Sequence, residues 1–245
     1  MDTRIRSLNI AESEAGTLAS VCQQLIETYG ATLVSLVAYG SSVAGGYEPG
    51  ISDINLVLVL ERGGFREISK AAPILRRSKL RLSPQFFDLA SVESLAEVCP
   101  MELRDMQIAH VVLHGRDLLS DLYVDEQRLR AECRRALTGV ATRIRHQALA
   151  VGDDPRALSA LTNDTLRAIL AVLRHLLRLE GKQIPPQKED LIRMAGRDYG
   201  FDCEPFVRAL GLRSEPGSDN QMKKAFESYF DALQSLAALI RSRLT

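Results

Sequence analysis

The clearest pattern of apolar and polar positions in this chain is an apolar run, a small polar loop and a second apolar run. Leu36–Tyr39 leads directly into Gly40-Ser41-Ser42, and the second run, 54–60, follows Asp53. After Asn55 the second run is apolar on both faces, which is typical of a strand in the middle of a sheet. The pattern therefore predicts a strand, a loop rich in small residues and a buried strand.

The rest of the first half predicts further short strands and helices in alternation. Its apolar spacing and its glycine and proline breaks predict helices over 12–27, 65–79 and 91–98, and strands over 80–88 and 109–114. Elements of this kind favour a domain that combines a sheet with helices, of the α+β class. We expect residues 1–122 to form one domain.

Beyond residue 122 the apolar positions recur at helical spacing. Three long stripes begin near Leu129, Leu158 and Met222, and turns rich in glycine, proline or polar residues separate them, including one at 214–219. Three long amphipathic helices with short links predict an antiparallel helical bundle. We expect this second domain to span residues 123–245.

Composition restricts the classes of function. The chain has 245 residues, 46% hydrophobic and 25% charged, as in ordinary globular proteins. A formal net charge of +0 and an aromatic content of 5% argue against a nucleic-acid partner. No run approaches the ~20 apolar residues of a membrane span, and the N-terminus has no signal-peptide pattern. The four cysteines lie far apart, which indicates free thiols in a reducing compartment. These features predict a cytoplasmic protein.

The loop and the second strand also suggest a chemistry. A turn of small residues with free backbone N–H groups, such as Gly40-Ser41-Ser42, can bind phosphate oxygens. A carboxylate at the start of the next strand, here Asp53, can bind the Mg²⁺ that accompanies phosphates. Asp53 and Asn55 are two residues apart, so in a strand their side chains point to the same face.

Gly40-Ser41, followed by Ser52-Asp53-Ile54-Asn55 at the head of an apolar strand, resembles the signature of the nucleotidyltransferase superfamily. The order of a small α/β domain and a helical bundle resembles the kanamycin-type members. The resemblance extends over essentially the whole chain. The chain also resembles a group of bacterial proteins of about this length that carry this fold. It implies a mixed sheet flanked by helices and a triphosphate bound with Mg²⁺ or Mn²⁺.

The resemblance also implies roles for individual residues. Gly40, Ser41 and Ser42 would bind the nucleotide phosphates, and Lys188 of the helical domain could reach the triphosphate. The metal ligands would be Asp53, Asn55 and a third carboxylate on a later segment, with Asp53 and that carboxylate catalytic. Glu102 is the first candidate for the third carboxylate, Asp88 the second and Asp105 the third.

The sequence departs from the family pattern at Asn55, where the family has an acidic residue. An amide offers a neutral oxygen in place of a charged one, so we expect weaker binding of Mg²⁺. Two functions therefore stay open. One is a nucleotidyltransferase that moves a nucleoside monophosphate from a nucleoside triphosphate to a hydroxyl of a small molecule or a protein. The other is a degenerate protein of this fold that binds nucleotide or a partner without catalysis. The acceptor is unknown, and the chain could form a homodimer.

Overall fold

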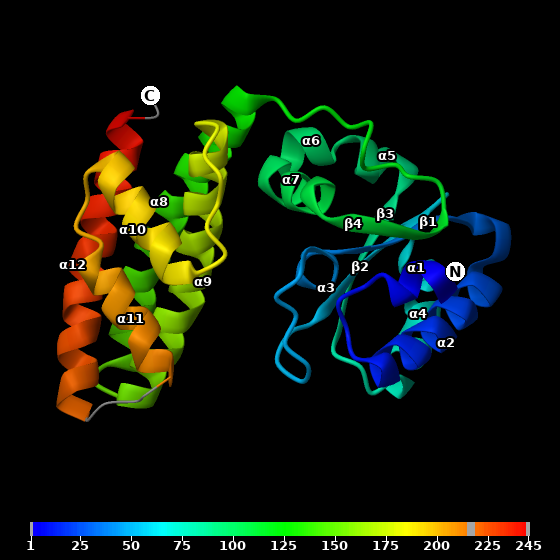
Figure 1. The fold of residues 1–245 in the computed structure, drawn as a ribbon, viewed down its shortest axis with the longest axis horizontal. Coiled ribbons are helices and arrows are strands. Elements are labelled where there is room, and N and C mark those ends of the chain that lie inside the picture. Colours follow the sequence, from blue (N-terminus) through cyan, green and yellow to red (C-terminus); the bar gives the residue numbers. More distant parts are fainter. Residues whose placement is uncertain (1, 215–218, 244–245) are drawn as a thin grey trace. The chain divides into compact units, whose positions relative to one another are not determined.

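Four strands form a mixed sheet in the N-terminal half of the chain, in the order β3-β2-β1-β4 (Figure 1). β1 runs antiparallel to both β2 and β4, whereas β2 and β3 are parallel. The structure is a computed structural model that describes residues 2–214 and 219–243. The strands are β1 (Leu33–Tyr39), β2 (Ile54–Leu60), β3 (Leu82–Asp88) and β4 (His110–Gly115).

Helices lie on both sides of this sheet (Figure 1). On one side are α1 (Asp2–Arg6), α2 (Glu12–Tyr29) and α4 (Phe65–Arg77). Alternate residues of β2, among them Leu56 and Leu58, pack against this side in an apolar core. The other side carries α5 (Leu89–Glu93), α6 (Leu95–Val98) and α7 (Pro100–Ile108). Both central strands are almost fully buried, because helices cover both faces.

One segment of this half differs from the sequence prediction, and the structure settles a second whose pattern is ambiguous. Residues 41–44 lie in the predicted loop, but they form a helical turn, α3 (Ser41–Ala44). The spacing of apolar residues over 101–108 does not distinguish a helix from a strand, and in the structure these residues belong to α7. Pro100 is the first residue of α7, a position where proline costs no helical hydrogen bond.

The C-terminal half is a helical bundle. Its members are α8 (Glu126–Val151), α9 (Pro155–Leu179), α10 (Lys188–Tyr199), α11 (Glu204–Ser214) and α12 (Asp219–Arg243). The long helices α8, α9 and α12 pack on one another, and a buried hydrogen bond of 2.8 Å joins the hydroxyls of Thr165 and Tyr229. Most of the polar turn expected at 214–219 lies outside the described residues.

The chain divides into the units Met1–Asp125 and Glu126–Thr245, close to the boundary expected after residue 122. The first unit contains the sheet, and all the regular elements described in the second are helices. The α+β fold class is therefore confirmed. No helix among the described residues has the length and apolar character that a membrane crossing needs.

Candidate functional site

Gly40 turns the chain sharply between β1 and α3. Its backbone has φ 80° and ψ −145°, a region that only glycine adopts readily. The N–H of Gly40 donates to the carbonyl of Ala109 at 3.0 Å, and its own carbonyl accepts from Val43 and Ala44. The turn is thus fixed at both ends, and α3 starts directly behind it.

The two serines of the predicted phosphate-binding turn differ in their surroundings. Ser42 is buried, and its hydroxyl donates to the carbonyl of Tyr39 at 3.3 Å. Ser41 is partly exposed at the first position of α3. A phosphate at this turn would therefore meet the Ser41 hydroxyl, whereas the Ser42 hydroxyl is already used inside the protein.

Asn9 supports α3 from a distant part of the chain. Its backbone N–H donates to the carbonyl of Ser42 at 2.7 Å, and its side-chain Nδ2 donates to the carbonyl of Val43 at 2.8 Å. These bonds join the segment between α1 and α2 to the turn. The sequence analysis missed Asn9, because no local pattern indicates a contact between residues so far apart.

Asp53 and Asn55 lie at the start of β2, beside this turn. In the sheet Asn55 is paired with Tyr39 on one side and with Ser83 on the other. The Nδ2 atom of Asn55 faces Gly40 so closely that a Cβ on Gly40 would lie 2.8 Å from it. The structure therefore brings the predicted turn and the predicted metal-binding strand together.

Asp53 forms an ion pair with Arg81, the residue that precedes β3. Oδ1 of Asp53 lies 2.9 Å from Nε of Arg81, and the two side chains are 48% and 56% exposed. A charged group thus already contacts the predicted metal ligand. The sequence analysis missed Arg81, which becomes a neighbour of Asp53 only through the parallel pairing of β2 with β3.

Glu102 reaches the same face of the sheet from α7. Its Oε1 accepts a hydrogen bond from Nε2 of Gln85 on β3, and Gln85 is paired with Val57, two residues beyond Asn55. On β1, burial and then the charges of Glu102 and Asp105 raise the pKa of Tyr39 to about 12. Because paired residues of neighbouring strands point to the same side of a sheet, Glu102 lies on the side of the sheet that carries Asn55.

The other two carboxylate candidates lie differently. Asp88 is paired with Leu60, at the opposite end of β2 from Asp53, and its side chain caps α5 by accepting the N–H of Ser91. Asp105 is on α7 with Glu102, and its charge acts on Tyr39. The register thus favours Glu102 and Asp105 over Asp88. Lys188 is the first residue of α10, in the helical unit.

The side chains around Asp53 can be examined for their ability to bind a divalent metal ion. Within the described residues, no group of three or more His, Cys, Asp and Glu side chains is close enough to hold an ion. Mg²⁺ is usually bound by one or two carboxylates together with the phosphates of its substrate. Asp53, with the amide oxygen of Asn55 nearby, fits a metal that arrives with a triphosphate.

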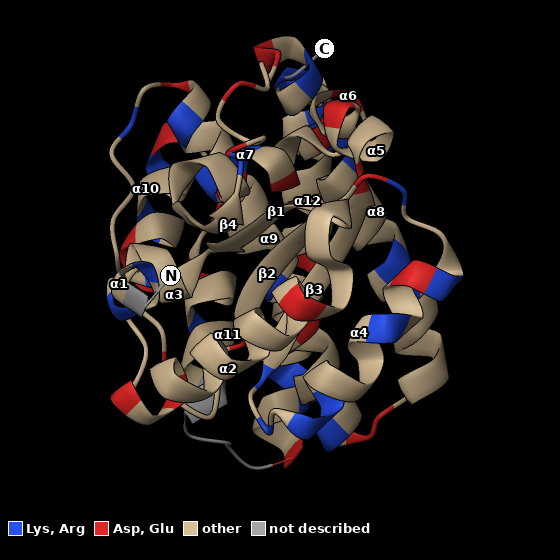
Figure 2. Cartoon of the chain, turned by 90° about the vertical axis from the view of Figure 1, so that its right-hand side faces the viewer, with Lys and Arg blue, Asp and Glu red and all other residues tan. Residues whose placement is uncertain are grey.

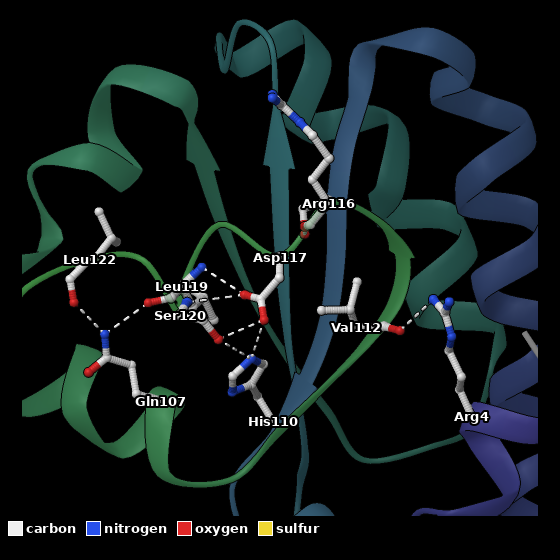
Figure 3. Close-up of polar contacts among 10 residues, drawn as sticks. Arg4, Gln107, His110, Val112, Arg116, Asp117, Leu119, Ser120 and Leu122 are labelled. Carbon is white, nitrogen blue, oxygen red and sulfur yellow. Dashed lines mark hydrogen bonds and ion pairs between the residues drawn. The ribbon is translucent and has the colours of Figure 1, made fainter.

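A cluster of His110, Asp117 and Ser120 lies at the adjoining edge of the sheet (Figure 3). Nε2 of His110 is 3.0 Å from Oδ2 of Asp117, and the Ser120 hydroxyl donates to the same Oδ2 at 2.7 Å. In a nucleophilic triad the serine and the aspartate use different nitrogens of the histidine. Here both lie at Nε2, so the cluster fixes the turn that follows β4.

Comparisons with known proteins extend this picture. No protein-family model matches the sequence, and no curated protein sequence matches it. The chain is similar in structure to the spectinomycin adenyltransferase AAD(9) from Enterococcus faecialis, solved with ATP and spectinomycin, at 14% identity and a TM-score of 0.56. That alignment covers 92% of this chain and 100% of the other.

A nucleotidyltransferase-like protein from Exiguobacterium sibiricum 255-15 aligns over 89% of this chain and 75% of its own. Its identity is 13% and its TM-score 0.32. The match to the adenyltransferase covers 92% of this chain, so it includes parts of both the sheet-containing unit and the helical unit. The chain has the fold of this adenyltransferase.

Proposed function

We propose that the protein is a nucleotidyltransferase, which moves a nucleoside monophosphate from a nucleoside triphosphate to a hydroxyl group of a small molecule or a protein. The observation that carries the proposal is the position of Asp53. It directly precedes β2, two residues before Asn55, whose side chain contacts Gly40. The fold of the chain matches an adenyltransferase solved with ATP, over 92% of this chain and 100% of the other.

The proposed reaction is a displacement at the α-phosphorus. The acceptor hydroxyl oxygen forms a bond to that phosphorus, the bond to the bridging oxygen of the β-phosphate breaks, and pyrophosphate leaves. Glu102 would take the hydroxyl proton, since it reaches from α7 to Gln85, on the side of the sheet that carries Asn55. Such transfers depend mainly on positioning and on charge neutralisation, which asks little covalent chemistry of the protein.

The other residues bind and position the nucleotide. The backbone of Gly40, Ser41 and Ser42 and the Ser41 hydroxyl would contact the phosphates, and Lys188 would contribute a positive charge. Asp53, the amide oxygen of Asn55 and Glu102 would hold Mg²⁺ or Mn²⁺. When bound, the metal neutralises phosphate charge and favours the departure of pyrophosphate.

The test is transfer of label from α-³²P-labelled nucleoside triphosphates, with Mg²⁺ or Mn²⁺, to a metabolite mixture and to the protein itself. Asp53→Ala should reduce transfer at least 100-fold, because the one charged ligand at the start of β2 is lost. Asp121→Ala, which removes an exposed carboxylate elsewhere in the first unit, is the matched control. If Asp53→Ala transfers label at the wild-type rate, the assignment is wrong.

A second candidate function is nucleotide or partner binding without catalysis. It is favoured by the neutral side chain of Asn55 at a predicted metal-ligand position, because the neighbouring strand residues Ser83 and Gln85 on β3 supply no carboxylate in its place. Asn55→Asp separates the two functions. A large gain in metal-dependent transfer would mark the natural site as degenerate, whereas a loss of existing transfer would show that Asn55 belongs to a working site.

A further inference from the structure

Arg81 forms an ion pair with the carboxylate of Asp53, the group that would bind a metal ion in the proposed function. Its Nε donates to Oδ1 of Asp53 at 2.9 Å. Both side chains are about half exposed, and an ion pair in such a setting contributes little to stability because water competes for both groups. The contact is therefore weak enough to exchange for another partner.

The backbone around Arg81 keeps the guanidinium at this place. The carbonyl of Arg81 accepts the N–H of Ile54, the residue after Asp53, at 2.7 Å. Two residues earlier, Lys79 has φ 59°, a left-handed conformation that is uncommon for a residue other than glycine. Strained backbone of this kind is often found at ligand-binding sites.

The loop on the other side of Asp53 lies close to the same pair. Burial, the hydrogen bond to Glu14 and the charge of Asp53 raise the pKa of Tyr47 to about 12, and Arg81 acts in the opposite direction. The Tyr47 hydroxyl donates to Oε1 of Glu14 at 2.9 Å. The charges of Asp53 and Arg81 therefore both act on the Tyr47 hydroxyl.

The segment that leads to Arg81 is rich in basic residues. Arg76, Arg77 and Lys79 lie within five residues of it and are exposed, and none of them forms an ion pair within the described residues. Figure 2 shows basic residues at several places along α4, which leads into this segment. A positive potential repels a free divalent cation and attracts a polyanion.

We propose that Arg81 masks Asp53 until a nucleoside triphosphate binds, and that it then moves from the carboxylate to the phosphates. Asp53 accepts the metal in the same step, so the metal enters together with the nucleotide. Arg81 is thus a substrate-binding residue and a barrier to binding of metal alone. The inference deepens the proposed function and rests on it.

The experiment compares the wild-type protein with Arg81→Met and Arg81→Lys by calorimetry and by electron paramagnetic resonance of Mn²⁺. With Mn²⁺ alone, Arg81→Met should bind about 3- to 10-fold more tightly than wild type, because the competing charge is gone. Arg81→Lys should lie between the two. Arg66→Met, which removes an exposed charge from the start of α4, is the control and should match wild type.

A second measurement uses ATP in the presence of EDTA and then with Mg²⁺. Arg81→Met should weaken ATP binding about 5- to 10-fold without metal and less with it. Equal Mn²⁺ affinities for wild type and Arg81→Met would overturn the masking role, and equal ATP affinities would overturn the transfer to phosphate. If wild type binds none of the four nucleoside triphosphates, the proposed function fails, and the Mn²⁺ comparison still decides whether Arg81 masks Asp53.

Discussion

Gly40 and Asn55 pack so closely that a Cβ atom on Gly40 would lie 2.8 Å from Nδ2 of Asn55. The two residues come from the phosphate-binding turn and the metal-binding strand that the sequence analysis predicted separately. Their contact fixes the distance between the two halves of the candidate site. It also explains why no larger residue fits at position 40.

Replacement of Gly40 by alanine should therefore be costly. The backbone at φ 80° and ψ −145° disfavours any side chain, and the new methyl group would collide with Asn55. We expect a loss of about 2–4 kcal/mol in the free energy of unfolding, measured by urea denaturation. Gly50→Ala is the control, since Gly50 also has a positive φ of 76° but open space around it. Equal losses for the two variants would show that the contact with Asn55 is unimportant.

Glu102→Gln should separate chemistry from binding. The variant keeps the shape of the side chain and a partner for Gln85, but it can no longer accept a proton. We expect label transfer to fall at least 100-fold while the affinity for ATP changes less than about 3-fold. Asp105→Asn tests the neighbouring candidate on α7, and Asp88→Asn, at the far end of β2, should leave transfer unchanged. A larger effect of Asp105→Asn would reassign the base to Asp105.

Asn9→Ala should loosen α3. The variant loses the bond from Nδ2 to the carbonyl of Val43 but keeps the bond from its backbone N–H to Ser42. Loss of one such bond costs about 1 kcal/mol. Hydrogen exchange at residues 43–45 should quicken about 5-fold, and ATP affinity should fall by a similar factor. If residues 43–45 of the variant exchange at the same rate as in the wild type, α3 is stable without the side chain of Asn9.

Asp117 should make stability depend on pH in the acid range (Figure 3). Burial raises its pKa, but hydrogen bonds from His110, Ser120 and the N–H of Leu119 outweigh burial and lower the pKa from 3.8 to about 2. A depressed pKa stabilises the folded state above the unfolded value and loses this effect as pH falls through the folded value. The contribution of Asp117 should therefore be complete above about pH 4 and absent near pH 2.

The matched variants are Asp117→Asn and Asp121→Asn, which lie in the same connection after β4. At pH 7 Asp117→Asn should lose about 1–2 kcal/mol of unfolding free energy, and the difference from wild type should shrink as pH approaches 2. Asp121→Asn should follow wild type throughout. A difference that stays constant down to pH 2 would mean that the carboxylate charge is not what stabilises the turn.

The sequence alone determined the features that depend on local pattern. The buried strand β2 follows from its unbroken apolar run, the turn before it from Gly40, and the long helices from their apolar stripes. The helical turn α3 was missed, because four residues bounded by glycines are too short to show a helical period. The position of Asp53 just before β2 was also predicted, because Asp53 and the apolar run of β2 are adjacent in the sequence.

Only the tertiary structure decided which groups meet there. Arg81 reaches Asp53 through the pairing of β2 with β3, Glu102 reaches Gln85 across one face of the sheet, and Asn9 reaches α3 from before the first long helix. Each contact joins residues that are far apart in the chain, so its existence depends on strand register and helix packing. Those are set by burial of the whole apolar core, which no local stretch of sequence specifies.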